Sequence, residues 1–129
     1  MIIVDASAVL AILLREPNWE AVAALLDPTN LVSAESLPLE IGNSLSSLVR
    51  RNLLADEMAQ KIWSAYTSLP VRLLEIPYLM ALDLAFAHKI YAYDAYILAV
   101  AMQHRSQLLT LDKEMACVAK SLGITVKGV

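Results

Sequence analysis

The sequence predicts a three-layer α/β/α fold with a mostly parallel central sheet of about five strands. Short apolar runs that favour strands alternate along the chain with longer segments that repeat apolar residues at helical spacing. The hydrophobic fraction is 58% and the mean hydropathy is +0.56, which suits strands buried between two helical layers. No repeat, linker or low-complexity tract interrupts the pattern. A chain of 129 residues can bury one ordinary core, so we expect a single domain over residues 1–129.

The first 76 residues contain three strand signals separated by helical segments. Strands are expected at 2–4 (IIV), 31–33 (LVS) and 71–76 (VRLLEI). Helices are expected at 7–16, 18–27, 37–52 and 56–69. Pro17 and Pro28 end the first two helices. Because Pro38 is tolerated only in a first turn, the third helix should begin at Ser36 or Leu37.

The rest of the chain continues the alternation. Helices are expected at 78–88, 94–105 and 112–122, and strands at 108–111 (LLTL) and 124–126 (ITV). Gly123 suits the C-terminal cap of the last helix, because glycine adopts a left-handed backbone without strain. Strands that alternate with helices in this way form parallel sheets.

The hydrophobic content raises the question of a membrane span, and the lengths of the apolar runs answer it. Charge-free runs such as 6–14 and 95–104 are well under the ~18 to 20 apolar residues that a span needs. The start MIIVD lacks the basic flank of a signal peptide. The single cysteine, Cys117, cannot pair within the chain, and we expect it to pack in the core. We therefore expect a cytoplasmic protein with no membrane partner.

Four acidic residues stand where an α/β fold places its functional crevice, beyond the carboxyl ends of the strands. Asp5 directly follows the first predicted strand, and Asp112 follows the fourth. Asp94 lies on the apolar, inward stripe of its predicted helix. Glu40 lies at the border of such a stripe, near a helix N-terminus. The four side chains are expected to converge.

Helix capping is the competing explanation for three of these acids. Asp5, Asp94 and Asp112 each precede or open a predicted helix, where a carboxylate cap contributes about 1 kcal/mol. Taken singly, Asp94 and Asp112 fit caps better than catalytic groups. Only the joint placement of the four acids indicates a site.

The net charge of −3 by itself argues against a nucleic-acid partner. The chain has thirteen acidic and ten basic residues. If the four acids form one metal-loaded site, nine acidic residues remain against ten basic ones. That balance does not oppose contact with a phosphate backbone.

Four segments resemble, in order and approximate spacing, the acidic motifs of the PIN-domain family. They are VDASAVLAILL, LEIGNSL, AYDAYILAVA and LLTLDKEM. The resemblance covers essentially the whole chain. Within the family, the sequence resembles the VapC-type toxins of toxin–antitoxin pairs. It implies a PIN-like fold and a ribonuclease that uses Mg²⁺ or Mn²⁺. By position, Asp5, Glu40 and Asp94 match the core acidic triad and Asp112 the more variable fourth acid, which makes these four the catalytic and metal-binding residues.

The resemblance also implies a polar pocket around these acids. Ser7, Asn43 and Thr110 match polar positions that line it, although Ser7 and Thr110 suit satisfied turn hydroxyls equally well. The candidate RNA contacts are Arg15, Lys89, Tyr91, Tyr93 and Lys113. For the tyrosines, packing is the stronger alternative.

Two protein partners follow from the same resemblance, a cognate antitoxin and a second copy of the chain in a homodimer. Large apolar side chains before Pro70 match the region where VapC-like proteins bind both. They are Trp19, Leu25, Leu26, Trp63 and Tyr66. Core packing explains these side chains nearly as well.

Carboxylate-held metal chemistry suits the sequence independently of the family. Hard cations take oxygen ligands, and metal-bound water becomes a nucleophile near neutral pH. The sequence has few motifs for other catalytic mechanisms. Its three ungrouped glycines exclude a phosphate-binding loop, and no Cys/His cluster offers a zinc site. His88 and His104 have no acid or nucleophile patterned around them.

Two other function classes stay open. A Mg²⁺-binding phospho-acceptor signalling domain needs adjacent acids after its first strand, an acceptor aspartate after a middle strand and a late lysine. Here Asp5 stands alone, Glu75 follows the third strand and Lys127 the last, which is a poor match. A PIN-fold RNA-binding scaffold without activity is disfavoured because none of the four acids is missing.

Overall fold

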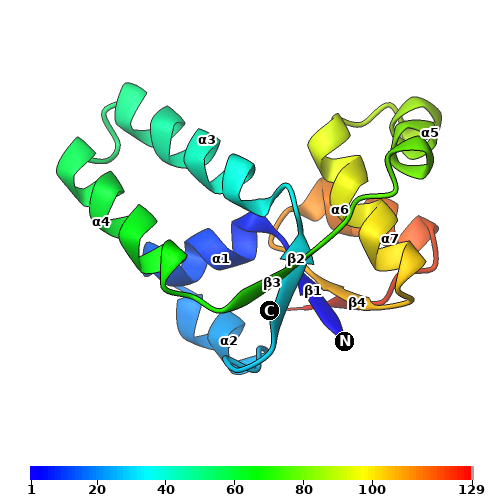
Figure 1. Cartoon of the computed structure of the whole chain (residues 1–129), viewed down its shortest axis with the longest axis horizontal. Helices are drawn as coiled ribbons and strands as arrows, with labels where there is room; N and C mark the ends of the chain where they lie inside the picture. Colours follow the sequence, from blue (N-terminus) through cyan, green and yellow to red (C-terminus); the bar gives the residue numbers. More distant parts are fainter. Residues whose placement is uncertain (129) are drawn as a thin grey trace.

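The computed structural model describes residues 1–128 (Figure 1). The elements follow in the order β1 (Ile2–Val4), α1 (Ala6–Leu13), α2 (Trp19–Ala24), β2 (Leu31–Ala34), α3 (Leu37–Arg50), α4 (Asp56–Thr67), β3 (Val71–Leu74), α5 (Tyr78–His88), α6 (Ala92–Gln103), β4 (Gln107–Leu109), α7 (Lys113–Ser121) and β5 (Val126–Lys127). The strands form one sheet in the order β3-β2-β1-β4-β5, and all neighbours are parallel. The predicted α/β/α fold with a parallel sheet is confirmed.

Consecutive residues of the central strands point into opposite layers. Ile3 and Leu108 belong to one buried cluster, and Val4 and Leu109 belong to the other. The same residues are neighbours in the sheet, since the register pairs Ile3 with Leu108 and Val4 with Leu109. Both faces are therefore buried, which explains why these strands read as continuous apolar runs without alternation.

Helices α1 to α4 cover one face of the sheet, and α5 to α7 cover the other (Figure 1). On the second side, α6 is almost enclosed, and Ile97 to Ala101 are all buried. In the sheet, β2 lies on one side of β1 and β4 lies on the other, so the strand order reverses direction at β1. In open α/β sheets such a switch point is where a crevice opens beyond the strand ends.

Several features differ from the expectations. β3 ends at Leu74 rather than Ile76, and β5 begins at Val126 rather than Ile124. β4 ends at Leu109, so Thr110 lies beyond the strand rather than inside it. α6 begins at Ala92 and not at Asp94, because Tyr91 already has the extended backbone of an N-cap. Cys117 is exposed on α7 and does not pack in the core. None of the helices within residues 1–128 is long and apolar enough to cross a membrane.

Candidate active site

Asp5 is the buried centre of the candidate site. It follows β1 directly, and its side chain is 4% exposed. Its Oδ1 accepts hydrogen bonds from the Ser7 hydroxyl at 2.7 Å and from the Ala8 backbone N–H at 3.0 Å. Its Oδ2 accepts from the Thr110 hydroxyl. Asp5 therefore caps α1, as the capping explanation expects, while both of its oxygens are also held in a fixed orientation.

Ser7 and Thr110 connect Asp5 to the loop that follows β4. The Ser7 hydroxyl accepts from the Leu111 N–H at 2.9 Å, and the Thr110 hydroxyl accepts from the Asp112 N–H at 3.0 Å. Each hydroxyl thus donates a hydrogen bond to Asp5 and accepts one from a backbone N–H group. These two predicted pocket residues are more than turn hydroxyls, because they orient the buried carboxylate.

Glu40 lies in the first turn of α3, a helix that begins at Leu37 with Pro38 in its first turn, as predicted. Its side chain is half-buried. Burial, and then the charges of Asp5 and Asp94, raise the pKa of Glu40 to about 8. In the metal-free protein this carboxyl group therefore holds a proton through much of the neutral range.

Asp94 is not a helix cap. It lies inside the first turn of α6, and the N-cap is Tyr91. A carboxylate near a helix N-terminus is usually stabilised by the helix dipole. Here burial, followed by the charges of Asp112, Asp5 and Glu114, instead raises the pKa of Asp94. The capping explanation is wrong for this residue, so its charge in an apolar segment needs another reason.

Asp112 is the N-cap of α7. Its Oδ1 accepts from the N–H groups of Glu114 at 2.9 Å and Met115 at 3.1 Å, and the residue is exposed. The capping explanation is thus confirmed for Asp112. Its charge still reaches the site, because it contributes to the raised pKa of both Asp5 and Asp94.

Glu114 is an acidic neighbour that the sequence analysis missed. It lines a small cavity of about 90 Å³ together with Asp94. Its only signal in the sequence is its position two residues after Asp112 in LDKEM.

The acids thus share one electrostatic neighbourhood beyond the carboxyl ends of β1 and β4. The pKa of Glu40 responds to Asp5 and Asp94, and the pKa of Asp94 responds to Asp5 and Asp112. Among residues 1–128, however, no three His, Cys, Asp or Glu side chains are grouped closely enough to hold a metal ion. Their oxygen donors are of the kind that Mg²⁺ and Mn²⁺ prefer, so the donor chemistry fits these ions. Coordination by these residues stays a prediction.

The third predicted pocket residue, Asn43, is exposed on α3. It lines a hollow of about 460 Å³ together with Ser7, Ser44 and Leu111. Asn43 therefore borders the network around Asp5 without taking part in it.

The candidate RNA contacts fall into two groups. Lys89 and Tyr91 line the same small cavity as Asp94, and Tyr91 is 83% exposed. Tyr93 is 41% exposed and meets Tyr96 edge-on, with ring centroids 5.8 Å apart. Packing is therefore a partial explanation for Tyr93 and none for Tyr91.

The two remaining basic candidates lie in different surroundings. Arg15 follows the C-terminal end of α1, and its guanidinium lies 3.9 Å from the ring centroid of Trp19. Lys113 is the exposed first residue of α7, next to Asp112.

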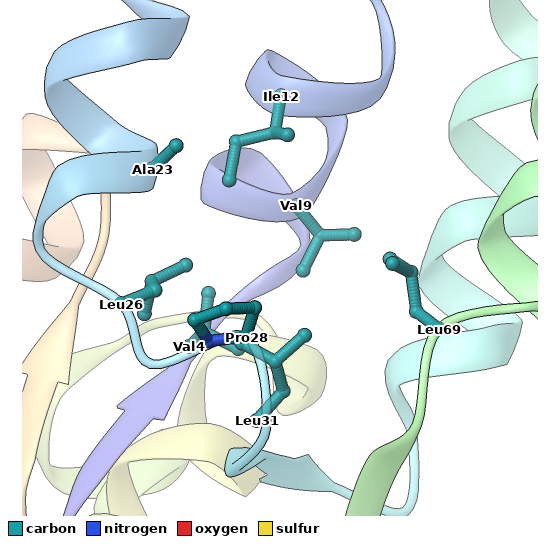
Figure 2. A pocket seen from close by; sticks show the side chains of 8 residues that line it. All are labelled: Val4, Val9, Ile12, Ala23, Leu26, Pro28, Leu31 and Leu69. Atoms are coloured by element: carbon teal, nitrogen blue, oxygen red, sulfur yellow. The ribbon is translucent and has the colours of Figure 1, made fainter.

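A purely apolar pocket lies between α1, α2 and the chain that enters β2 (Figure 2). Its volume is about 220 Å³, and it is lined by Val4, Val9, Ile12, Ala23, Leu26, Pro28, Leu31 and Leu69. Of the predicted partner residues, Leu26 faces it, whereas Tyr66 is buried in the core. Trp63 is 38% exposed and packs against Tyr66.

The model of the PIN domain matches residues 2–121, and the chain therefore belongs to the PIN-domain family. It is 32% identical over 120 residues to Ribonuclease VapC3 from Pyrobaculum aerophilum, which covers 89% of this chain and 92% of that protein. The crystal structure of PAE2754 from Pyrobaculum aerophilum is 25% identical, with a TM-score of 0.74, and the match covers 97% of this chain and 82% of that one. A toxin–antitoxin complex from Klebsiella pneumoniae is 14% identical, with a TM-score of 0.60 over 88% of each chain, which shows a shared fold. The resemblance inferred from the four motifs is confirmed.

Proposed function

We propose that this protein is a metal-dependent endoribonuclease and the toxin of a type II toxin–antitoxin pair, built as one PIN-like domain over residues 1–129. One observation carries the proposal. Carboxyl groups come from three separate elements, Asp5 after β1, Glu40 on α3 and Asp94 on α6, and the charge of Asp5, after burial, contributes to the raised pKa of the other two. Membership of the PIN-domain family and the likeness to a VapC ribonuclease support it.

Asp5, Glu40 and Asp94 would hold Mg²⁺ or Mn²⁺, with Asp112 beside them. When bound, such an ion generates a nucleophilic water and offsets negative charge on the phosphate oxygens. The same ion would relieve the repulsion between the carboxylates, which is the electrostatic reason for it to bind at this edge.

The protein's own groups have distinct tasks in this scheme. Asp5 is held by Ser7 and Thr110, so its oxygens need no reorientation when a ligand arrives. The Glu40 carboxyl group, with its pKa of about 8, holds a proton in the free protein and releases it when a cation binds. Asn43 borders the hollow beside this network, where a polar side chain can contact the RNA backbone.

The RNA would approach along the start of α6 and the start of α7. Lys89 and Tyr91 border the Asp94 cavity, and Lys113 adjoins Asp112. Lysines there offer charge to phosphates, and the exposed Tyr91 ring offers a surface for base stacking. Arg15 is the weakest of the candidate contacts, because its guanidinium already packs on Trp19.

A cognate antitoxin is the proposed protein partner. The apolar pocket between α1 and α2 has the size and chemistry to accept an apolar side chain of that partner (Figure 2). We also propose a homodimer in the cytoplasm. Leu79 and Phe86, which are 83% and 73% exposed, lie two turns apart on one face of α5 and would be covered in such a dimer.

Incubation of the purified protein with RNA tests the activity. Cleavage should require Mg²⁺ or Mn²⁺, stop with EDTA, and leave 5′-phosphate and 3′-hydroxyl ends, because water attacks phosphorus directly. Mapping of end-labelled products distinguishes this from attack by the ribose 2′-hydroxyl, which leaves a cyclic phosphate. Cyclic ends, or cleavage undiminished by EDTA, would exclude the mechanism.

The same ions should stabilise the folded protein. A ligand at a hundred times its Kd adds about 2.7 kcal/mol to the free energy of unfolding. We expect millimolar Mg²⁺ or Mn²⁺ to raise Tm and EDTA to reverse the shift.

A further inference from the structure

A second hollow, with a mainly apolar and aromatic lining, lies next to the acidic site, beyond the carboxyl ends of β2 and β3. Its volume is about 580 Å³, within the range of pockets that hold small organic ligands. It is lined by Glu35, Ser36, Leu39, Ile76, Tyr78, Ala92, Tyr93 and Tyr96. Glu35 and Ser36 follow β2, and Ile76 and Tyr78 follow β3. None of these residues belongs to the carboxylate cluster.

Three tyrosines form one side of this hollow. Tyr96 meets Tyr78 edge-on at a centroid distance of 5.5 Å and Tyr93 edge-on at 5.8 Å. Tyr78 is 50% exposed and Tyr93 is 41% exposed, so both rings keep free surface. Exposed aromatic faces of this kind are stacking surfaces for nucleobases.

The hollow also contains a buried hydroxyl that lacks a partner. The Ser36 side chain is 3% exposed, and its Oγ is the buried side-chain polar atom that makes no hydrogen bond within residues 1–128. Buried polar groups are nearly always paired, and an unpaired one destabilises the fold. The Oγ atom itself is covered in this conformation, but Ser36 lines the hollow, so rotation about its Cα–Cβ bond can turn the hydroxyl toward a ligand placed there.

A carboxylate also lines the hollow. The Tyr78 hydroxyl donates to Glu35 Oε1 at 2.5 Å, which anchors the carboxylate. Because the tyrosine proton is used in this bond, both Glu35 and the Tyr78 oxygen present acceptors to a ligand. The polar part of the hollow is therefore rich in acceptors.

Residues that line this hollow are sequence neighbours of residues in the acidic site. Leu39 immediately precedes Glu40 on α3, and Tyr93 immediately precedes Asp94 on α6. Neighbouring residues on a helix point about 100° apart, so each first turn presents one residue to the hollow and the next to the acids. The Glu40 N–H also donates to the Ser36 carbonyl at 3.1 Å.

We propose that this hollow binds one base of the RNA next to the scissile phosphate and that it prefers guanine. The inference rests on the proposed ribonuclease function. Guanine presents two adjacent donors, N1–H and the N2 amino group, which match an anchored carboxylate, and its O6 can accept from the Ser36 hydroxyl once that side chain turns toward the hollow. Uracil presents one donor between two carbonyl oxygens, which face the acceptors unfavourably.

Equilibrium binding tests this preference without any cleavage. The Asp94→Asn protein is titrated, in EDTA, against fluorescent seven-nucleotide RNAs that contain only uridine, or a single central guanosine, or inosine in its place. We expect the guanosine to strengthen binding at least about fivefold over uridine alone. Inosine lacks the N2 amino group and should lose most of that gain.

Two substitutions assign the preference to the hollow. Ser36→Ala and Glu35→Gln should each reduce the guanosine gain to about twofold or less and leave binding to the uridine-only RNA unchanged. Ser36→Ala should not lower Tm, because it removes a hydroxyl without a partner. Glu57→Gln, an exposed carboxylate on α4, is the matched control and should keep the full guanosine gain.

Equal affinity for the guanosine and uridine RNAs would overturn the proposal, as would a guanosine gain that survives Glu35→Gln. Because this binding assay contains no metal and uses the inactivated Asp94→Asn protein, its result is independent of the cleavage assay. A protein that fails to cut RNA can still show the base preference, and an active ribonuclease can lack it.

Discussion

Val4 and Asp5 are joined by one peptide bond, yet they belong to two regions of opposite chemistry. Val4 lines the apolar pocket between α1 and α2, and Asp5 is the buried centre of the acidic edge. In both regions some side chains lack a favourable partner within the folded chain. At the edge, burial and neighbouring acidic charges raise the pKa values of Asp5, Glu40 and Asp94, and in the pocket apolar side chains surround about 220 Å³ that they do not fill.

The two regions differ in how firmly they are held. Asp5 is anchored through three hydrogen bonds that reach from α1 to the loop after β4. The apolar pocket is bounded only by non-directional packing, so its walls can adapt to what enters. Rigid, directed oxygens suit a small cation, which demands a defined geometry, whereas an adaptable apolar surface suits a protein partner.

The largest expected effect comes from removing one charge at the acidic edge. Asp94→Asn should lower metal-dependent RNA cleavage by at least about 100-fold, because the amide gives up the charge that holds a hard cation. Since Asp94 does not cap α6, the fold should persist, and loss of repulsion should slightly stabilise the metal-free protein. Initial cleavage rates and circular dichroism provide the measurements.

Asp56→Asn is the matched control for this variant. Asp56 is also an aspartate in the first turn of a helix, but it is exposed on α4. It should cleave at the wild-type rate. A folded Asp94→Asn protein with wild-type activity would contradict the assignment of Asp94.

The second effect is a pH dependence of the metal-free protein. The folded-state pKa of Glu40, about 8, lies above its ordinary value of 4.5, so the folded state binds a proton that the unfolded state has lost. Stability should therefore fall as pH rises from about 5 to 8, by about 2 kcal/mol once partial exposure is allowed for. The raised pKa values of Asp5 and Asp94 act in the same direction.

Urea unfolding at several pH values in EDTA measures this slope. Glu40→Gln should flatten it, whereas Glu57→Gln on the exposed face of α4 should leave it unchanged. A metal-free protein that becomes more stable between pH 5 and pH 8 would show that burial and neighbouring charges do not raise the pKa values of these carboxyl groups in the folded state.

The third effect concerns the apolar pocket. Ala23 lines the pocket from α2 (Figure 2), and Ala23→Leu should fill part of it. We expect a gain of about 1 kcal/mol in the free energy of unfolding and no change in RNA cleavage. Ala24→Leu, at the exposed neighbouring position, is the control and should change stability by less than about 0.5 kcal/mol. Equal effects of both substitutions would show that the pocket does not accept added side-chain volume.

The smallest effect separates the two roles of Asp112. Asp112→Ala removes the cap of α7 and should cost about 1 kcal/mol, whereas Asp112→Asn keeps an N-cap oxygen and should cost little. If Asp112 also contributes charge to the site, both substitutions should weaken Mg²⁺ binding to a similar degree. Chemical denaturation and Mg²⁺ titration followed by Tm measure the two effects separately.

The sequence by itself determined the layers of the fold and the order of its elements. Continuous apolar strands such as Ile2 to Val4 and amphipathic helices such as α3 carry this information locally, in residue periodicity. The four acids could be selected from the sequence because Asp5 and Asp112 follow strands and because the surrounding segments resemble family motifs. Glu114 and the hollow around Ser36 could not be selected, because no local pattern marks them.

Only the tertiary structure decided which acid is a cap and which is not. Capping depends on whether an oxygen reaches the N–H groups of the next turn, and a shift of two residues in the start of α6 removed Asp94 from that role. The tertiary structure likewise decided the partners of Asp5. Thr110 becomes its donor because the parallel pairing of β1 with β4 brings two distant strand ends together. Sequence periodicity reports the environment of a residue along its own element, whereas hydrogen bonds and pKa shifts depend on what the other elements place beside it.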